Sequence, residues 1–467
     1  MSIASEITRI QTAKAAIKSA LEDRGATVGN KTIDEYSDIL DNVDGEYWDP
    51  NIEHLTFEGA TGSGYVFWMT NSSSWKKTIE YSKDNGTTWT SLTPWTSSDA
   101  ANGISISAGE TVLIRGNNDR YSNGIYFCYF LATSPGFEFY AYGNITDLLA
   151  VGYKQKIPYM GFYRLFYNCS CLRLNKTNHP LVLPSPEVGA AGYQEMFRGC
   201  SGITNMPDLP ATILSTFCYQ GMFYGCSSLT TVTATLPATT LAYGCYINMF
   251  ALCTSLTTTP TLPAARVLQY SYQYMFQGCT ALVNPPTLPA TIVSSYGYMY
   301  MFYNCTSLAT APELPATSIN SYCYQYMFYN CTALTTGPST LPATALYTNC
   351  YHSMFRGCSS LTTPPTLPAT TLASGCYTNM FYQCTSLIVA PELPAETLVS
   401  SCYNGMFNGC SKLKYIRAYF TTTPSTTYTS NWVYGVAATG TFVKNASMSS
   451  WTTGDNGIPS GWTVQNA

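Results

Sequence analysis

The residues of this chain that could do chemistry are its 18 cysteines, three histidines and many of its 38 tyrosines. Ten cysteines share one position of an internal repeat and six share a position eight residues earlier, leaving only Cys128 and Cys171 outside. Eight residues span about 12 Å along a helix, too far for a disulfide. Unpaired thiols pack as small hydrophobic side chains, so the sequence predicts a ladder of buried free cysteines.

A metal site or a catalytic site is not expected from these residues. C-x-x-C pairs are absent, and the only close pair of cysteines is Cys169 with Cys171, which does not fit a zinc site. Glu392 and Glu396 fit a solvated loop better than a pair of catalytic carboxylates. The chain has three histidines, His54, His179 and His352, and their spacing from Ser, Asp and Cys residues indicates no Ser/His/Asp or Cys/His catalytic arrangement. We expect no enzyme, no metal and no cofactor.

Most of the cysteines belong to a repeat of 26 or 27 residues. A degenerate copy at Leu165 precedes nine copies of the string M-F-x-x-C, whose Met residues are at 196, 222, 249, 275, 301, 327, 354, 380 and 406. Tyr lies three residues before each Met, and an L-P-A triplet recurs eight times from Leu209 to Leu393. The four-residue spacing of apolar positions predicts a short helix in each unit, ended by Gly or Asn three residues after Met. The Thr- and Pro-rich remainder predicts an extended segment.

One such unit cannot bury its own apolar face, whereas about ten stacked units share a continuous core. The sequence therefore predicts a solenoid over residues 151–413. After residue 413 the repeat disappears, and Trp432, Trp451 and Trp462 are available to cover the end of the stack, so residues 414–467 are expected to be a capping region.

Two further segments precede the solenoid. Residues 1–46 contain apolar residues at alternating spacings of four and three, which predicts helices and a trimeric coiled coil or, equally, a helical hairpin packed on its own chain. The candidate oligomer seam is Ile3, Ile7, Ile10, Lys14, Ile17 and Leu21. Residues 51–150 have alternating β-branched runs and a turn at Asn85 and Gly86, which predicts a β-sandwich. The predicted fold class is thus multidomain α+β.

The unit C-T-S-L…L-P-A-T-x-L…C-Y-x-x-M-F-x-G-C resembles the repeats of BspA-like leucine-rich-repeat proteins over residues 165–413. The resemblance implies a leucine-rich-repeat-like solenoid and an adhesive surface protein. The opening S-E-I-T-R-I-Q-T-A-K resembles the N-terminal segment of structural proteins of tailed bacteriophages. That second resemblance implies a virion protein, a tail or head fibre whose N-terminus contacts other virion proteins.

Composition limits the partners. The net charge is −4 and charged residues make up 10% of the chain, so nucleic acid is not expected as a partner. No run of about 18 apolar residues is present, and the N-terminus lacks the apolar run of a secretory signal. We therefore expect no membrane insertion and no export by that route.

The surface of the solenoid is expected to carry the function. Only eight charged side chains occur from residue 196 to residue 413, which suits a neutral ligand such as a host glycan. Extra tyrosines outside the buried rows are candidate ligand-facing residues, unless they pack on neighbouring repeats or on a partner subunit. They are Tyr270, Tyr274, Tyr296, Tyr300, Tyr303, Tyr322, Tyr326 and Tyr329. The first hypothesis is a trimeric virion fibre that attaches to a host-surface glycan or protein, and the alternative is a bacterial cell-surface adhesin.

Overall fold

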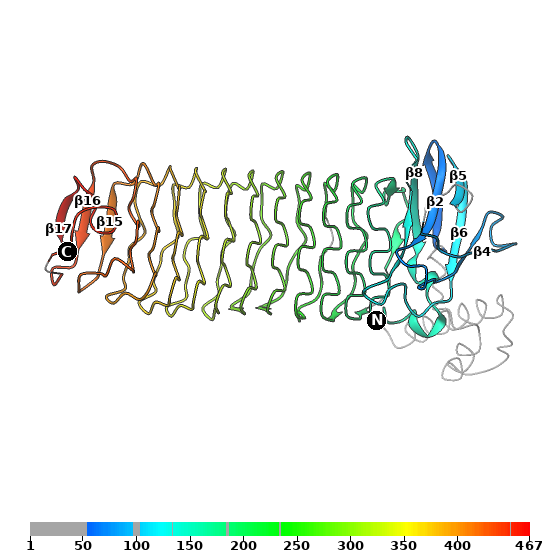
Figure 1. The fold of residues 1–467 in the computed structure, drawn as a ribbon, viewed down its shortest axis with the longest axis horizontal. Coiled ribbons are helices and arrows are strands. Elements are labelled where there is room, and N and C mark those ends of the chain that lie inside the picture. Colours follow the sequence, from blue (N-terminus) through cyan, green and yellow to red (C-terminus); the bar gives the residue numbers. More distant parts are fainter. Residues whose placement is uncertain (1–53, 97–102, 133, 184–185, 233–234, 449) are drawn as a thin grey trace, which may run out of the picture.

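The molecule is a rod of regularly spaced rungs with a β-sandwich at one end and a small sheet at the other (Figure 1). The computed structural model describes residues 54–96, 103–132, 134–183, 186–232, 235–448 and 450–467. Among these residues no helix is long and apolar enough to cross a membrane.

The sandwich consists of two layers around a core of aromatic side chains, and β1 to β8 pair with one another in antiparallel fashion. One layer, in the order β10-β8-β1-β6-β3-β4, has β9 beside β8, and the other has the order β5-β2-β7. Phe57, Trp68, Phe130 and Phe139 fill the space between the layers and are fully buried. The strands of the sandwich are β1 (Thr56–Thr61), β2 (Ser63–Thr70), β3 (Ile79–Ser82), β4 (Thr90–Leu92), β5 (Gly103–Ser107), β6 (Thr111–Gly116), β7 (Cys128–Leu131) and β8 (Glu138–Asn144).

The sandwich also covers the first rung of the solenoid. The strands β9 (Leu172–Arg173) and β10 (Leu181–Val182) come from the first rungs, and both pair in parallel with β8. From the other layer, the Phe130 amide donates to the Leu165 carbonyl at 2.7 Å. Because its strands bond directly to the first rung, the sandwich protects the apolar end of the stack.

Each M-F-x-x-C segment is a chain of tight turns in which every fourth residue is left-handed. Residues five before, one before and three after each Met have positive φ, for example Tyr296 (62°), Tyr300 (59°) and Asn304 (60°) around Met301. We call these the left-handed positions. A positive φ at the third residue of a turn is typical of type II turns. The chain therefore reverses every few residues instead of winding into a helix.

Along each M-F-x-x-C segment, successive backbone N–H groups donate alternately within their own rung and to the next rung. From Tyr298 to Cys305, every second N–H donates to the carbonyl three residues earlier, as Met301 does to Tyr298 at 3.1 Å. The N–H groups between them donate to the following rung, as Phe302 does to Met327 at 2.9 Å. All eight N–H groups of this segment are thus satisfied.

The helix expected in each repeat is therefore wrong. A four-residue turn period brings residues four apart to the same face, as a helix does, so the spacing of Cys, Met and Cys fits both structures. The only helices among the described residues are the short 3-10 helices η3 (Ile145–Leu148) and η4 (Val151–Tyr153), so the α+β fold class is also wrong. The helices predicted for residues 1–46 and their seam, Ile3 to Leu21, lie outside the described residues.

Two columns of stacked rings form the core of the rod. The Phe after each Met lies over the Phe of the next rung, with centroids 5.7 Å apart for Phe276 and Phe302 and 5.5 Å apart for Phe302 and Phe328. The Tyr three residues before each Met forms a second buried column, with Tyr298 and Tyr324 5.6 Å apart. Offset stacks of this kind add stability to that gained from burying the apolar area of the rings.

The cysteine after each Phe also bonds to the neighbouring rung. Its thiol donates to the Phe carbonyl of the preceding rung in nine successive pairs, for example Cys305 to Phe276 at 3.1 Å. Desolvation in the core raises the pKa of the Cys305 thiol to about 12, so the sulfur stays protonated. The cysteines of the described residues are free thiols, and all but Cys171 are buried.

The opposite side of each rung is extended. In the L-P-A triplets Leu and Ala point inward, as Leu314 and Ala316 do, while Pro between them faces outward. Neighbouring rungs meet there in parallel bridges, including Thr310 to Thr336 to Thr363. Longer parallel pairs form between β11 (Glu187–Val188) and β12 (Ile213–Leu214), and between β13 (Arg266–Val267) and β14 (Ile292–Val293).

The ring columns end on a tryptophan cluster after the last repeat. Phe407 contacts the buried Trp432 at 6.1 Å, and Trp432 contacts Trp451 at 5.4 Å. Three parallel strands close this end of the rod: β15 (Tyr415–Ala418), β16 (Thr441–Lys444) and β17 (Thr463–Asn466).

We predict that Phe302→Ala lowers the free energy of unfolding by about 3 to 5 kcal/mol, because it removes a buried ring from the middle of the column. Urea unfolding of the full chain measures this change. Thr332→Ala is the control: its exposed hydroxyl bonds to the Thr306 carbonyl of the preceding rung, and its loss should change stability by less than about 0.5 kcal/mol. Equal losses in the two variants would contradict the packing described.

We also predict that stability falls as the pH rises above about 9. The unfolded thiols ionise near their ordinary pKa of about 8.5, whereas burial holds the pKa of Cys305, Cys323 and Cys410 near about 12, so the folded state retains more protons between these values. Urea midpoints measured from pH 7 to pH 11 test this. Cys305→Ala should flatten the decline by about 1.4 kcal/mol per pH unit, and a flat profile in the parent protein would refute it.

Candidate ligand-binding surface

The eight tyrosines expected to face a ligand lie on one stretch of the solenoid, over three successive rungs. All eight are half-buried. Tyr270, Tyr296 and Tyr322 form one column, five residues before each Met. Tyr274, Tyr300, Tyr326, Tyr303 and Tyr329 form a second group, which we call the tyrosine block.

Within the tyrosine block the rings stack along the rod. The centroids of Tyr274 and Tyr300 are 4.6 Å apart, as are those of Tyr300 and Tyr326, with interplanar angles of 12° and 13°. Tyr303 and Tyr329 stack beside them at 4.9 Å, and each meets its neighbour of the same rung edge to face. Neighbouring rings therefore cover both faces of Tyr300, and its ring edge and hydroxyl group remain for a ligand.

Six of the eight tyrosines occupy left-handed positions, with φ between 57° and 62°. A bulky residue in this region costs about 1 to 2 kcal/mol relative to a right-handed conformation. At the position before Met, four of the other six repeats have residues that tolerate this conformation, Gly221, Asn248, Asn379 and Gly405, and the remaining two have Glu195 and Ser353. The fold therefore does not require tyrosine at these positions.

The hydroxyls of Tyr274, Tyr300 and Tyr326 stay neutral. Burial raises the pKa of Tyr300 well above its usual value, and the neighbouring phenols raise it further. Burial likewise raises the pKa of Tyr274 and Tyr326. Neutral phenols can both donate and accept hydrogen bonds, so the surface offers hydrogen-bond donors and acceptors over a wide pH range.

One end of the block carries two basic residues that the sequence analysis missed. His352 meets Tyr326 edge to face at 5.2 Å, and burial lowers the pKa of His352. The Arg356 guanidinium lies 5.5 Å from the Tyr329 ring centroid and 4.2 Å from that of Tyr382. Arg356 occupies the same place in its repeat as Tyr303 and Tyr329, two residues after Met, and this shared position was the available signal.

Comparison with known protein families identifies the family to which the repeat belongs. The family model described as the BspA type leucine rich repeat region matches residues 164–309, 248–388 and 298–432, which together make up more than half of the chain. The chain belongs to this family. The predicted BspA-like leucine-rich-repeat solenoid is therefore confirmed, although its rungs contain turns where helices were expected.

Among solved structures, this BspA-type chain is similar to a leucine rich cell surface protein from Faecalibacterium prausnitzii A2-165. The identity is 17% and the TM-score is 0.35, and the match covers 79% of this chain and 94% of the other. A search of curated proteins finds no match.

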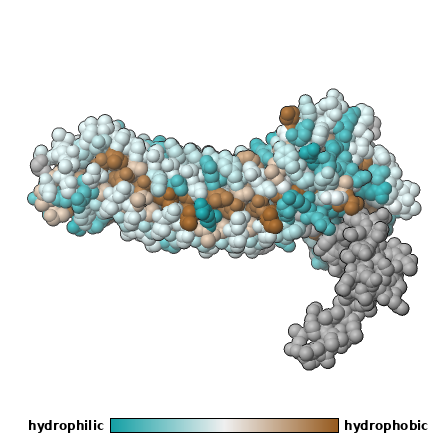
Figure 2. All heavy atoms as spheres, turned by 90° about the horizontal axis from the view of Figure 1, so that it is seen from below, coloured by the Kyte–Doolittle hydropathy of each residue, from teal (hydrophilic) through white to brown (hydrophobic). Residues whose placement is uncertain are grey.

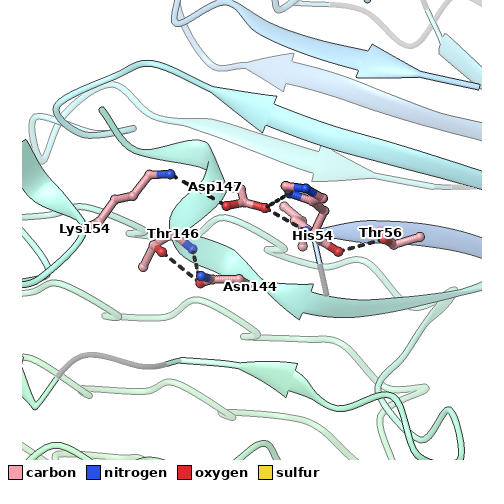
Figure 3. Close-up of polar contacts among 7 residues, drawn as sticks. His54, Thr56, Asn144, Thr146, Asp147 and Lys154 are labelled. Atoms are coloured by element: carbon pink, nitrogen blue, oxygen red, sulfur yellow. Dashed lines mark hydrogen bonds and ion pairs between the residues drawn. The ribbon is translucent and has the colours of Figure 1, made fainter. Parts of the chain in front are cut away.

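The BspA-type chain also has a cavity of about 550 Å³ in its sandwich, beside Trp89, Arg115 and Lys154. Figure 3 shows Asp147 between His54 and Lys154 at this place. The Asp147 carboxylate accepts from the His54 ring at 3.1 Å and from the Leu55 amide at 3.1 Å. These contacts tie the start of β1 to η3, so the carboxylate holds the sandwich together where the chain enters the solenoid.

The other residues considered for chemistry contact different neighbours and do not form a common site. His179 packs on the Tyr142 ring at 5.2 Å, and Glu392 accepts from Arg417 and Tyr419, each at 3.2 Å. Within the part of the chain that the structure describes, no group of three His, Cys, Asp or Glu side chains could hold a metal ion. The described residues thus bring together the tyrosines and His352, whereas His54, His179 and Glu392 contact other residues.

Figure 2 shows how hydropathy is distributed over one face of the rod. Hydrophobic side chains gather along the solenoid, and strongly hydrophilic ones concentrate on the sandwich. Exposed aliphatic residues of the solenoid include Ile213 (57% exposed) and Val389 (49% exposed). The solenoid is thus the less polar part of the surface that this view presents.

We predict that Tyr300→Asn changes the free energy of unfolding by less than about 1 kcal/mol. The substitution removes ring contacts but also relieves a left-handed tyrosine, because asparagine adopts this conformation readily. Tyr298→Asn in the buried column should instead lower stability by more than about 3 kcal/mol. Urea unfolding of both variants measures the difference, and a larger loss in Tyr300→Asn would contradict the strain at this position.

Proposed function

We propose that this protein is a non-enzymatic attachment protein of a bacterial cell surface, and that it binds through the eight tyrosines of the solenoid. The observation that carries the proposal is that six of them occupy left-handed positions, which hold Gly or Asn at seven of the twelve equivalent places in the other repeats. Side chains retained against a local conformational cost are typical of functional sites. Tyrosines that present ring edges and hydroxyls on a rigid scaffold fit binding rather than catalysis.

Membership of the BspA-type family supports this reading, because the family resemblance implies adhesion at a surface. The virion fibre remains an alternative prediction. The residues that suggest it lie outside the described part of the chain, and none of the comparisons above is with a bacteriophage protein. The trimeric state also remains a prediction.

We predict that Tyr274→Ser, Tyr300→Ser and Tyr326→Ser combined reduce attachment at least about tenfold, because they remove three adjacent binding groups. Beads coated with the full chain, applied to cultured epithelial cells and to mucin-coated plates, measure attachment. Tyr224→Ser is the control, since Tyr224 is a half-buried tyrosine two positions after Met and outside the eight.

The control variant should attach like the parent protein. Parent beads that attach to neither surface, or a tyrosine variant that attaches as well as the parent, would overturn the proposal. Urea unfolding of each variant shows that the rod is intact before attachment is compared.

A further inference from the structure

We infer that the ligand of the tyrosine block is an extended, neutral polysaccharide that lies along the rod and bonds to the phenol hydroxyls of successive rungs. This inference rests on the proposed function and adds the class of ligand and its direction. It differs from the usual stacking of an aromatic face on a sugar ring, because both faces of the central ring, Tyr300, are occupied.

The first argument comes from the stacking of the rings. Tyr300 has Tyr274 on one side and Tyr326 on the other, both at 4.6 Å, which leaves no room for a sugar ring against its faces. Ring edges and hydroxyls therefore provide the contacts. Because the three residues occupy the same position in successive repeats, they present one hydroxyl per rung.

The second argument comes from the backbone. A bound peptide strand requires unpaired N–H and C=O groups at a sheet edge. In the rungs that carry the block, the N–H groups from Tyr272 to Cys279, from Tyr298 to Cys305 and from Tyr324 to Cys331 all donate within the rod. The backbone of these segments thus has no donor left for a polypeptide, and recognition depends on side chains.

The third argument comes from charge. Between Arg266 and Arg356 the sequence has one charged residue, Glu313. The Arg356 guanidinium lies over the rings of Tyr329 and Tyr382. Burial and the neighbouring phenols keep Tyr300 protonated. A neutral ligand rich in hydroxyls matches donors and acceptors of this kind better than an acidic polymer does.

The repetition of the site sets the direction of the ligand. A polymer lying along the rod can make the same contact at each rung, and every further contact is intramolecular once the first has formed. Affinity should therefore rise with chain length until the three rungs are spanned, at roughly three sugar units, and then level off.

The test uses size-fractionated neutral glucans and mannans with the full-length protein in isothermal titration calorimetry. Tyr274→Phe, Tyr300→Phe and Tyr326→Phe combined keep the stacked rings and remove only the hydroxyls. Loss of three hydrogen bonds should weaken binding on the order of a hundredfold. Tyr224→Phe, the control, should leave binding unchanged.

Wild-type affinity in the triple Phe variant would overturn the inference, because it would place the contact on the rings. Affinity independent of chain length would overturn the direction along the rod. Absence of binding to every neutral glucan and mannan, with the serine variant still losing attachment, would refute the ligand class and leave the proposed function standing. Absence of attachment by the parent protein would refute both.

Discussion

Hydrogen bonds between the backbones of successive rungs are the interaction on which the rest of this structure depends. They require every second N–H of the M-F-x-x-C segment to point along the rod, and the left-handed residue in every fourth place makes that possible. Once the rungs are in register, equivalent side chains must lie over one another. Ring columns, thiol contacts and the half-buried tyrosine stacks all follow from this register.

The same register explains why cysteine fits the repeat. The position four after Met is fully buried, so it admits a small side chain, and the Phe carbonyl of the preceding rung accepts a hydrogen bond from the thiol. A free thiol satisfies both conditions with little loss of apolar packing. The cysteine content thus reflects packing, and the sequence suffices to predict it because the cysteines fall in fixed columns.

The repeat length, the buried columns and the solenoid could be predicted from the sequence, whereas the local conformation could not. Residues four apart share a face in a helix and in a chain of four-residue turns, so the pattern of Cys, Tyr, Met and Phe fits both. The distinguishing signal was the recurrence of Gly or Asn one and five residues before Met, as at Gly221 and Gly244. In the middle repeats tyrosine replaces these residues and hides the signal.

The candidate site was predictable only in part. Elimination of the buried columns identified the eight tyrosines, because a ring outside these columns has to lie near the surface. The stacking of these rings and the contacts of Arg356 and His352 join residues of neighbouring rungs. They depend on how one rung lies over the next, and the sequence of a single repeat does not specify this. The left-handed strain at Tyr300 likewise appears only once the turn is known.

The central claim is that each M-F-x-x-C segment is a set of turns bonded to the next rung, and far-ultraviolet circular dichroism of the full chain tests it most directly. The account predicts a spectrum dominated by β-structure and turns. A helical signal large enough to account for a helix in every repeat would contradict it.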